Sequence, residues 1–494
     1  MLKRFFIPVL LVLVTIAGAM YWLLGGDHAP RDMREAVPVE KFTLRNGLKV
    51  IVMPNSSMPA VTHILLVRAG GADDPYGKTG LAHYLEHLMF MGTKAYPSGV
   101  YERTVARVGG QQNAYTSYDF TAYHSTVPKD ELKHVMAMEA DRLLNITFDT
   151  ERAARELNVI TEERNMRVDN SAVNLFGEQM GALTFFNHPY GRPLIGWAED
   201  MKGLTAADAQ KFFRQHYRAG NMVLVVAGDV DTGEVRRMAQ HYYGALPASV
   251  ATKRNWPEEP PVRMRRRGEM EDEKAHEYRL LRQYSAPSAL SGKTEEALPL
   301  SVLAQYLGGG STSELYRTLV MEQKIATEVY ASYEDLNMGP SVFRIVAVPA
   351  PGVALPQLEK AMDGVIEQAL GNLPSEAAVV RAKTQLKAQV VFAQDGLGPL
   401  AHLMGQLAML GKDEQYFYEW ADKVEAVRAT DMLNAAQHVL DPARAVTGYL
   451  VPAHANTVEV APAPAPVPVA EPIAAPAAPE VTPGAPAPSE EIAQ

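Results

Sequence analysis

Gly80-Leu-Ala-His-Tyr-Leu-Glu-His-Leu-Met-Phe-Met-Gly92 is a stretch in which one side of a helix can pack while the other carries chemistry. On a helix, His83 and His87 are four residues apart, so both imidazoles project from the same face. The opposite face is apolar, because leucines recur at helical spacing at Leu81, Leu85 and Leu88. The stretch therefore predicts an amphipathic helix with a buried side and a polar side.

The polar side of this predicted helix has the residues of a metal site. Two histidines at this spacing suit a tetrahedral metal ion, and Glu86 lies beside them, within reach of a water on the metal's open position. The order His-x-x-Glu-His is the reverse of the commoner zinc-protease motif. With 13 histidines in the chain, the pattern also arises by chance. The alternative is two partly buried histidines and a solvated glutamate on an ordinary helix.

The composition narrows the classes of protein. The chain has no cysteines, so disulfides and thiolate ligands are excluded, and any metal must be held by His, Asp or Glu. The net charge is −10, with charges of both signs mixed along 494 residues. This pattern predicts no nucleic-acid partner.

The two ends of the chain differ from the rest. Phe5 to Leu24 is an apolar run of 20 residues preceded by two basic residues. It is long enough to cross a bilayer and would place the following chain outside the cytoplasm. Residues 1–26 are therefore predicted to be a membrane anchor, with a signal sequence cleaved near Ala17-Gly18-Ala19 as the alternative. Residues 457–494 are almost entirely Ala, Pro, Val and Glu, which predicts a disordered tail.

The folded part is predicted to be α+β and to consist of two halves, residues 36–250 and 259–456. The Pro-rich stretch Asn255 to Pro261 separates them. Leu204 to Asp208 precedes a predicted helix and then a strand. A similar segment with the same order of elements, here called the echo, occurs 223 residues later (431 minus 208) at Val427 to Asp431. This echo suggests two copies of one α+β unit.

A catalytic zinc site needs a third protein ligand, with water in the fourth position. The predicted helix from Glu151 to Val168 offers Glu156, Glu162 and Glu163. Glu156 and Glu163 are seven residues apart and share a face, whereas Glu162 sits about 100° away from it. The spacing alone leaves the choice of ligand open.

These motifs make the chain resemble the pitrilysin/insulinase family of zinc metallopeptidases, in particular its short-chain, processing-peptidase-like branch. In that family the His-x-x-Glu-His motif is followed, after a stretch of similar length, by a glutamate ligand with another glutamate seven residues before it. Here Glu163 follows His87 by 76 residues (163 minus 87), and Glu156 stands at the earlier position. The resemblance spans Val37 to Pro452.

The resemblance implies His83, His87 and Glu163 as ligands of one zinc ion per chain, with Glu156 orienting a ligand. Glu86 would be the general base that takes a proton from the water on the zinc. The implied fold has two homologous α/β-roll halves, each a sheet flanked by helices. They form a clam-like peptidase chamber, to which the N-terminal membrane helix is added. The first half is then the catalytic domain, and the second lacks the zinc motif.

A glycine-led segment gives the resemblance a substrate site. Gly109-Gly-Gln-Gln-Asn-Ala-Tyr-Thr-Ser117 resembles the turn and edge strand on which the family lays its substrate. Asn113 and Ala114 match the positions that meet the substrate backbone. An edge strand has unpaired N–H and C=O groups, so an extended peptide can add to it.

The second half departs from the family pattern at two positions. Active members carry there an arginine and a tyrosine that grip the substrate, and the aligned residues here are Val320 and Thr327. Neither supplies a charged or phenolic contact. Two-subunit members divide labour in this way, which implies that this chain is the zinc-bearing partner of a homologous subunit carrying the Arg/Tyr pair. The alternative is that Tyr330 or Arg317 substitutes and the chain works alone or as a homodimer.

The sequence therefore predicts a zinc endopeptidase that hydrolyses peptides or unfolded polypeptide segments outside the cytoplasm. Its expected place is the bacterial periplasm, anchored to the inner membrane, or secreted there if the N-terminus is cleaved. The alternative function is a non-catalytic peptide-binding or assembly subunit of an envelope complex.

Overall fold

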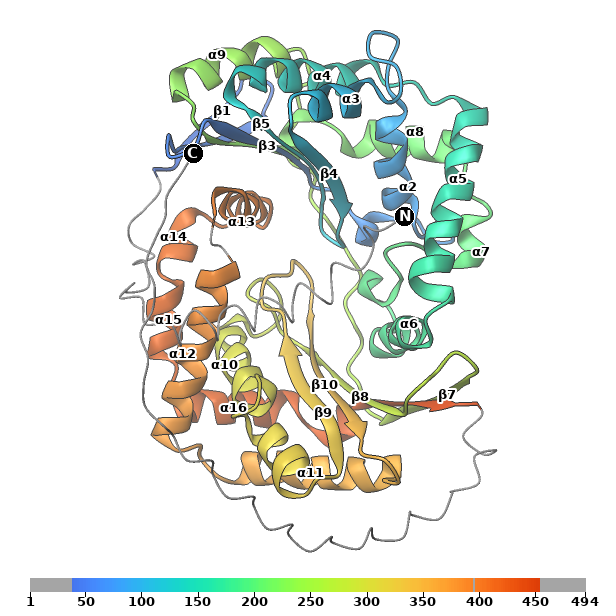
Figure 1. Cartoon of the computed structure of the whole chain (residues 1–494), viewed down its shortest axis with the longest axis vertical. Helices are drawn as coiled ribbons and strands as arrows, with labels where there is room; N and C mark the ends of the chain where they lie inside the picture. Colours follow the sequence, from blue (N-terminus) through green and yellow to red (C-terminus); the bar gives the residue numbers. More distant parts are fainter. Residues whose placement is uncertain (1–37, 394–395, 454–494) are drawn as a thin grey trace, which may run out of the picture. The chain divides into compact units, whose positions relative to one another are not determined.

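The computed structural model describes residues 38–393 and 396–453, and these contain two β-sheets and their helices (Figure 1). The predicted membrane segment at 1–26 and the predicted tail at 457–494 lie outside the described residues. Within the described ranges, no helix combines the length and the apolar character that crossing a membrane requires.

The first sheet has six strands in the order β1-β2-β6-β3-β5-β4. β2 and β6 run parallel, with Ile51 opposite Val225, and the other neighbouring pairs are antiparallel. β4 therefore forms one edge of this sheet. Its strands are β1 Glu40–Thr43, β2 Lys49–Pro54, β3 Ala60–Val67, β4 Gln111–Thr116, β5 Thr121–Pro128 and β6 Met222–Gly228. The helices of this half are α2 Leu81–Leu88, α3 Val100–Arg107, α4 Leu132–Asn145, α5 Thr150–Arg164, α6 Ala172–Thr184, α7 Ala198–Met201, α8 Ala206–His216 and α9 Thr232–Tyr243.

The second sheet repeats the first without its β1. Its order is β7-β11-β8-β10-β9, with β7 parallel to β11 and the other pairs antiparallel. Its strands are β7 Arg266–Asp272, β8 Arg279–Ala286, β9 Ala326–Tyr333, β10 Ser341–Pro349 and β11 Val446–Pro452. The helices of this half are α10 Ala297–Gly308, α11 Leu355–Gly371, α12 Glu376–Ala393, α13 Leu397–Met409, α14 Glu414–Tyr418, α15 Trp420–Ala426 and α16 Ala429–Val439.

The matching strand orders confirm the prediction of two related α+β halves. The echo between Asp208 and Asp431 falls on equivalent elements, the first turns of α8 and α16. Each aspartate accepts a hydrogen bond from the backbone N–H of the residue that caps its helix, and such caps satisfy N–H groups that a helix leaves unpaired. The limits 36–250 and 259–456 stay a prediction for the two domains.

Each half lends one helix to the sheet of the other. α13 packs its Ala401, Met404 and Leu407 against an apolar sheet face that includes Ile64 and Leu66 of β3. A Cβ on Gly405 would lie 2.5 Å from the Leu66 side chain, so glycine lets this helix approach the sheet closely.

The reciprocal contact is made by α6, whose Phe176 and Met180 pack against Val446 and Leu450 of β11. There the glycine is on the strand, because a Cβ on Gly448 would lie 2.3 Å from the Met180 sulfur. The two sheets are thus each covered by helices from both halves.

Some predicted elements have different limits. The edge strand expected within Gly109 to Ser117 is β4, and a turn closed by a hydrogen bond from the Ser117 N–H to the Phe120 carbonyl joins it to β5. The helix expected to reach Val168 ends as α-helix at Arg164 and continues as a π-helical turn over Asn165–Asp169.

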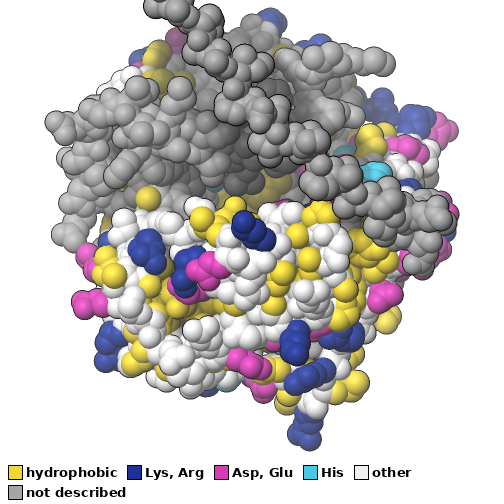
Figure 2. All heavy atoms as spheres, turned by 60° about the horizontal axis from the view of Figure 1, so that its bottom comes forward, with side chains coloured by type: hydrophobic (Ala, Val, Ile, Leu, Met, Phe, Trp, Pro, Cys, Tyr) yellow, Lys and Arg dark blue, Asp and Glu magenta, His cyan; other side chains and the backbone are white. Residues whose placement is uncertain are grey.

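Charged side chains of both signs are mixed on the surface as they are along the sequence. Figure 2 shows Lys and Arg interspersed with Asp and Glu over the described part of the face in view. The described part of this face therefore carries no broad field of one sign.

A buried histidine in the first sheet makes stability sensitive to acid. His63 on β3 is fully buried, and its Nε2 is hydrogen-bonded to the Tyr243 hydroxyl at 2.8 Å. Burial, followed by the charge of Arg142, lowers the pKa of His63 to about 3. The unfolded chain takes up this proton near its ordinary pKa of 6.5, so the folded state loses stability as pH falls below that value.

We expect buried His63 to lower the free energy of unfolding by about 2 kcal/mol between pH 7 and pH 5, because each pH unit below the unfolded pKa of 6.5 costs about 1.4 kcal/mol. The free energy of unfolding in urea at the two pH values measures it. The His63→Gln variant should lose about 2 kcal/mol less than the wild type over the same interval. Equal losses in the two proteins would contradict the assignment.

Candidate metal centre

The helix of the motif, α2, is held at its first turn by a buried carboxylate. The backbone N–H groups of Gly80 and Ala82 each donate to Asp74, at 2.8 Å, and these bonds satisfy N–H groups that the start of a helix leaves unpaired. Gly80 has a φ of +84°, and a Cβ there would lie 2.4 Å from the Ile195 carbonyl oxygen. Glycine is therefore required where α2 begins.

The apolar face of α2 is buried as predicted. Leu81, Leu85 and Leu88 all belong to the core of the first half. Tyr84 adds a link to the next functional helix, because its hydroxyl donates to the Ala153 carbonyl of α5 at 2.7 Å. Packing of α2 on the core and on α5 turns its polar face toward the glutamates of α5.

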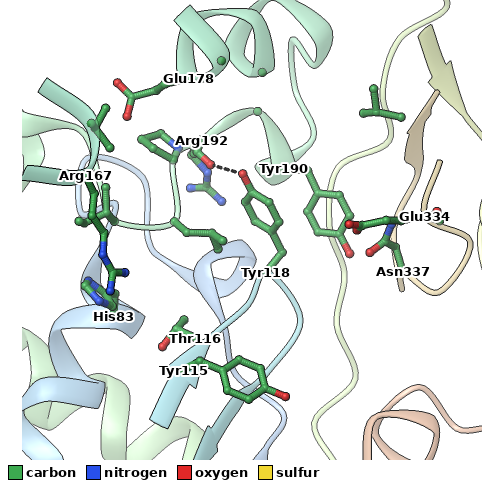
Figure 3. A pocket seen from close by; sticks show the side chains of 18 of the residues that line it. His83, Tyr115, Thr116, Tyr118, Arg167, Glu178, Tyr190, Arg192, Glu334 and Asn337 are labelled. Atoms are coloured by element: carbon green, nitrogen blue, oxygen red, sulfur yellow. Dashed lines mark hydrogen bonds between the residues drawn. The ribbon is translucent and has the colours of Figure 1, made fainter. Parts of the chain in front are cut away.

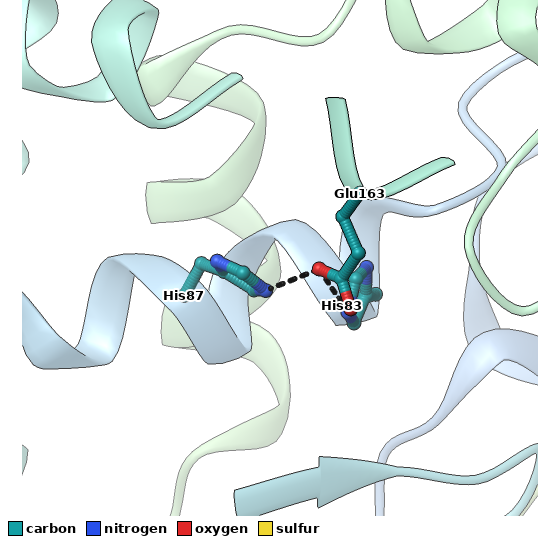
Figure 4. A group of neighbouring side chains, drawn as sticks. All are labelled: His83, His87 and Glu163. Atoms are coloured by element: carbon teal, nitrogen blue, oxygen red, sulfur yellow. Dashed lines mark ion pairs between the residues drawn. The ribbon is translucent and has the colours of Figure 1, made fainter. Parts of the chain in front are cut away.

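His83, His87 and Glu163 meet between α2 and α5 (Figure 4). The Glu163 Oε2 lies 3.2 Å from His87 Nε2 and 3.8 Å from His83 Nε2. Donor atoms about 2.1 Å from a tetrahedral zinc ion lie about 3.4 Å from one another, so this grouping fits such an ion. Glu162, the other candidate for this position, is exposed and lies outside the grouping.

Glu156 contacts the far side of one imidazole. Its Oε1 lies 2.8 Å from His87 Nδ1, so that nitrogen donates to Glu156 while Nε2 faces Glu163. Such a hydrogen bond fixes the tautomer and orientation of a histidine ligand. The Nδ1 of His83 is buried and has no hydrogen-bond partner among the described residues, so the two histidines are supported differently.

The electrostatic environment favours positive charge at this grouping. Burial opposes protonation of His87, but the hydrogen bonds that Glu156 and Glu163 accept from it raise its pKa to about 9. The hydrogen bond with His87 in turn lowers the pKa of Glu163. Burial and the neighbouring His87 lower the pKa of His83 to about 4. A divalent cation bound here would replace the proton on His87. The carboxylates would then stabilise the charge of the ion.

Glu86 is held by a residue that sequence reasoning missed. Thr116 of β4 donates its hydroxyl to Glu86 Oε2 at 2.5 Å. Burial raises the pKa of Glu86, and this hydrogen bond partly opposes the shift. A carboxyl group with a raised pKa is suited to accept and return a proton near neutral pH. The period-2 pattern of β4 gave no sign that Thr116 faces α2.

The grouping opens into a cavity of about 1030 Å³, and Figure 3 shows part of its lining. Asn113 and Ala114 line it from β4, the edge of the first sheet. The second half also contributes, through residues that include Tyr333, Glu334 and Arg344. The predicted substrate strand and the candidate metal ligands therefore share one cavity.

The residues weighed for the Arg/Tyr pair lie elsewhere among the described residues. Val320 packs against the core of the second half, and Arg317 is paired with Glu314 and Glu322. Neither these residues nor Thr327 and Tyr330 line the cavity of the candidate ligands. Arg344 is the arginine that the second half places there.

Comparison with known proteins finds matches to one peptidase family in both halves of the chain. The family model for insulinase (peptidase family M16) matches residues 49–197, and the model for the peptidase M16 inactive domain matches residues 203–386. The "Zinc protease PqqE" of Helicobacter pylori is 25% identical over 444 residues, covering 89% of this chain and 97% of that protein. The "Probable mitochondrial-processing peptidase subunit beta, mitochondrial" of Arabidopsis thaliana is 29% identical over 391 residues. The match covers 75% of this chain and 70% of that protein.

The fold is also shared with a solved structure. The crystal structure of a protease from Helicobacter pylori superposes with a TM-score of 0.77 at 24% identity, covering 84% of this chain and 99% of that one. Together, the two family models and the shared two-half fold show that this chain belongs to the insulinase family of peptidases, family M16.

Proposed function

We propose that this protein is a zinc-dependent endopeptidase that hydrolyses peptides or unfolded polypeptide segments. The observation that carries the proposal is the convergence of His83, His87 and Glu163, beside the buried Glu86, in a cavity of about 1030 Å³. The names of its relatives, which include zinc proteases, support the same reaction class.

The ligand set has the chemistry of a catalytic zinc site. His83, His87 and Glu163 would hold the ion, and Glu156 would orient His87. When bound, zinc polarises a carbonyl and lowers the pKa of water. Glu86 accepts a proton from the attacking water and delivers it to the leaving amine, while Thr116 fixes the carboxyl group in place.

The substrate we propose is an extended chain. β4 ends the first sheet, and Asn113 and Ala114 on it line the cavity. A peptide could add to this edge through backbone hydrogen bonds. The cavity volume is at the upper end of what small-molecule sites offer, about 300–1,000 Å³, which suits several residues of an extended peptide.

We expect the full chain, loaded with zinc, to cleave internal peptide bonds of unstructured substrates, such as reduced and denatured polypeptides. A chelator should stop cleavage, and zinc should restore it. The readout is product mass, which also separates internal cleavage from trimming of the ends. Absence of cleavage by a chain that binds zinc stoichiometrically would contradict self-sufficient activity.

A partner subunit is a second part of the proposal. Its support is that Val320 and Thr327 offer no charged or phenolic contact and do not line the cavity. A second support is that one relative is a processing-peptidase subunit beta. Arg344 in the same cavity favours a chain that works alone or as a homodimer. Cleavage by the isolated chain at full enzyme rates would contradict the heterodimer.

The location and the alternative function follow from other observations. The apolar run Phe5 to Leu24 supports a place outside the cytoplasm, in the bacterial periplasm, with attachment to the inner membrane through that run. The match of residues 203–386 to an inactive-domain model keeps a non-catalytic peptide-binding or assembly subunit as the competing function. Peptide binding without cleavage in the presence of zinc would favour that function.

A further inference from the structure

Arg167 forms an ion pair with one candidate metal ligand. Its NH1 lies 2.8 Å from Glu163 Oε1. The other oxygen of the same carboxylate, Oε2, is the one that faces His83 and His87. The two oxygens of the carboxylate thus have different partners. One is directed at the histidines, and the other is paired with a guanidinium.

The backbone around Arg167 is fixed by its own contacts. Arg167 lies in the π-helical turn Asn165–Asp169 that follows α5, and its carbonyl accepts a hydrogen bond from Asn174 at 2.7 Å. The buried Arg164, just before the turn, forms ion pairs with Asp169, the last residue of the turn, and with Glu178 of α6. Single π-helical turns inside helices are found frequently at functional sites.

The Arg167 side chain extends into the cavity rather than into the core. It is 71% exposed, lines the cavity of the candidate ligands and extends beside His83 (Figure 3). Its truncation would therefore remove charge and hydrogen bonding from the site while leaving the apolar core untouched.

We propose that Arg167 is a positioning residue that holds Glu163 so that only one carboxylate oxygen binds the metal. The inference rests on the proposed function, because it concerns the same ion. A carboxylate binding through both oxygens fills two positions around zinc, whereas one-oxygen binding leaves a position open for water. A charge-assisted bond from Arg167 to Oε1 keeps that oxygen away from the ion.

Arg167 also balances charge at the site. Glu86, Glu156 and Glu163 place three carboxyl groups around one divalent ion, so the charge of Arg167, a third positive charge beside the two of the ion, brings the cluster closer to neutrality.

The test uses the full chain loaded with Co²⁺, whose visible absorption reports coordination number, and compares Arg167→Ala with Arg155→Ala. Arg155 is the matched control, because it lies on α5, which the turn of Arg167 follows, is 67% exposed and pairs with Glu151 at the same i,i+4 spacing. Zinc affinity is measured in parallel by competition with a chelator.

In Arg167→Ala we expect a loss of absorption intensity, as the coordination number rises, and a change in zinc affinity of about tenfold or more. Arg167→Lys should restore much of the spectrum, and Arg155→Ala should match the wild type. A wild-type spectrum and affinity in Arg167→Ala would overturn the inference and leave the proposed function intact. Failure of the wild type to bind either metal would overturn both.

Discussion

Glu86→Gln is expected to abolish peptide hydrolysis while the protein still binds zinc. The amide has nearly the same shape and can still accept the hydrogen bond from Thr116, but it cannot take a proton from water. Loss of general acid–base catalysis costs about 10²–10⁴-fold in rate, and we expect about 10³-fold or more in kcat. KM should change little, because the cavity is unaltered.

The measurement is kcat and KM on an internally cleaved peptide, with zinc content determined on the same samples. Glu162→Gln is the matched control, since Glu162 is an exposed glutamate close in sequence to Glu163 and outside the grouping of candidate ligands. Retention of activity in Glu86→Gln would remove Glu86 from its proposed role. A parallel loss of zinc would show that the substitution acts through the metal site instead.

His87→Ala is expected to lose the metal. It removes one of the three donors around the site and leaves Glu156 without its 2.8 Å contact. The affinity for zinc should fall further than in Glu156→Gln, where only the orientation of His87 is disturbed and a loss of about 10–100-fold is expected. Hydrolysis should disappear in the first variant and persist at high zinc concentration in the second.

Titration of each variant with zinc against a chromophoric chelator measures this order. His134→Ala serves as the control, because His134 is exposed and its Nδ1 is hydrogen-bonded to Glu131 of the neighbouring turn, away from the candidate ligands. If His87→Ala and Glu156→Gln bound zinc equally well, the assignment of His87 as a ligand would be wrong.

The motif helix could be predicted from the sequence because its information is local. The spacing of His83 and His87 and the recurrence of leucines both depend on one helical period, and α2 has the predicted buried face. The seven-residue separation of Glu156 and Glu163 likewise placed both on one side of α5. The ligand roles themselves stay a prediction.

Contacts between distant segments could not be predicted in the same way. Thr116 reaches Glu86 because β4 lies beside α2, a fact of sheet order that the residues of β4 do not encode alone. Arg167 meets Glu163 at an ordinary helical spacing, but its presence in the cavity depends on where the end of α5 lies. Neither signal exists before the fold is assembled.

α6 was missed for a different reason. Gly177 and Gly181 lower the helix propensity of Ala172–Thr184, and its apolar residues pack on the second sheet rather than on its neighbours in sequence. Tertiary packing stabilises a helix that local preference does not. The duplication, in contrast, left a readable trace at Asp208 and Asp431, because a helix cap is a local feature.

The exchange of α6 and α13 has a consequence for biosynthesis. During synthesis, the strands of the first sheet leave the ribosome long before α13 at Leu397–Met409. The apolar sheet face that includes Ile64 and Leu66 therefore stays exposed to solvent until most of the chain has emerged. The nascent first half must therefore pass through an unfinished, aggregation-prone stage. Separately produced halves should be poorly soluble alone and regain solubility when made together in the same cell.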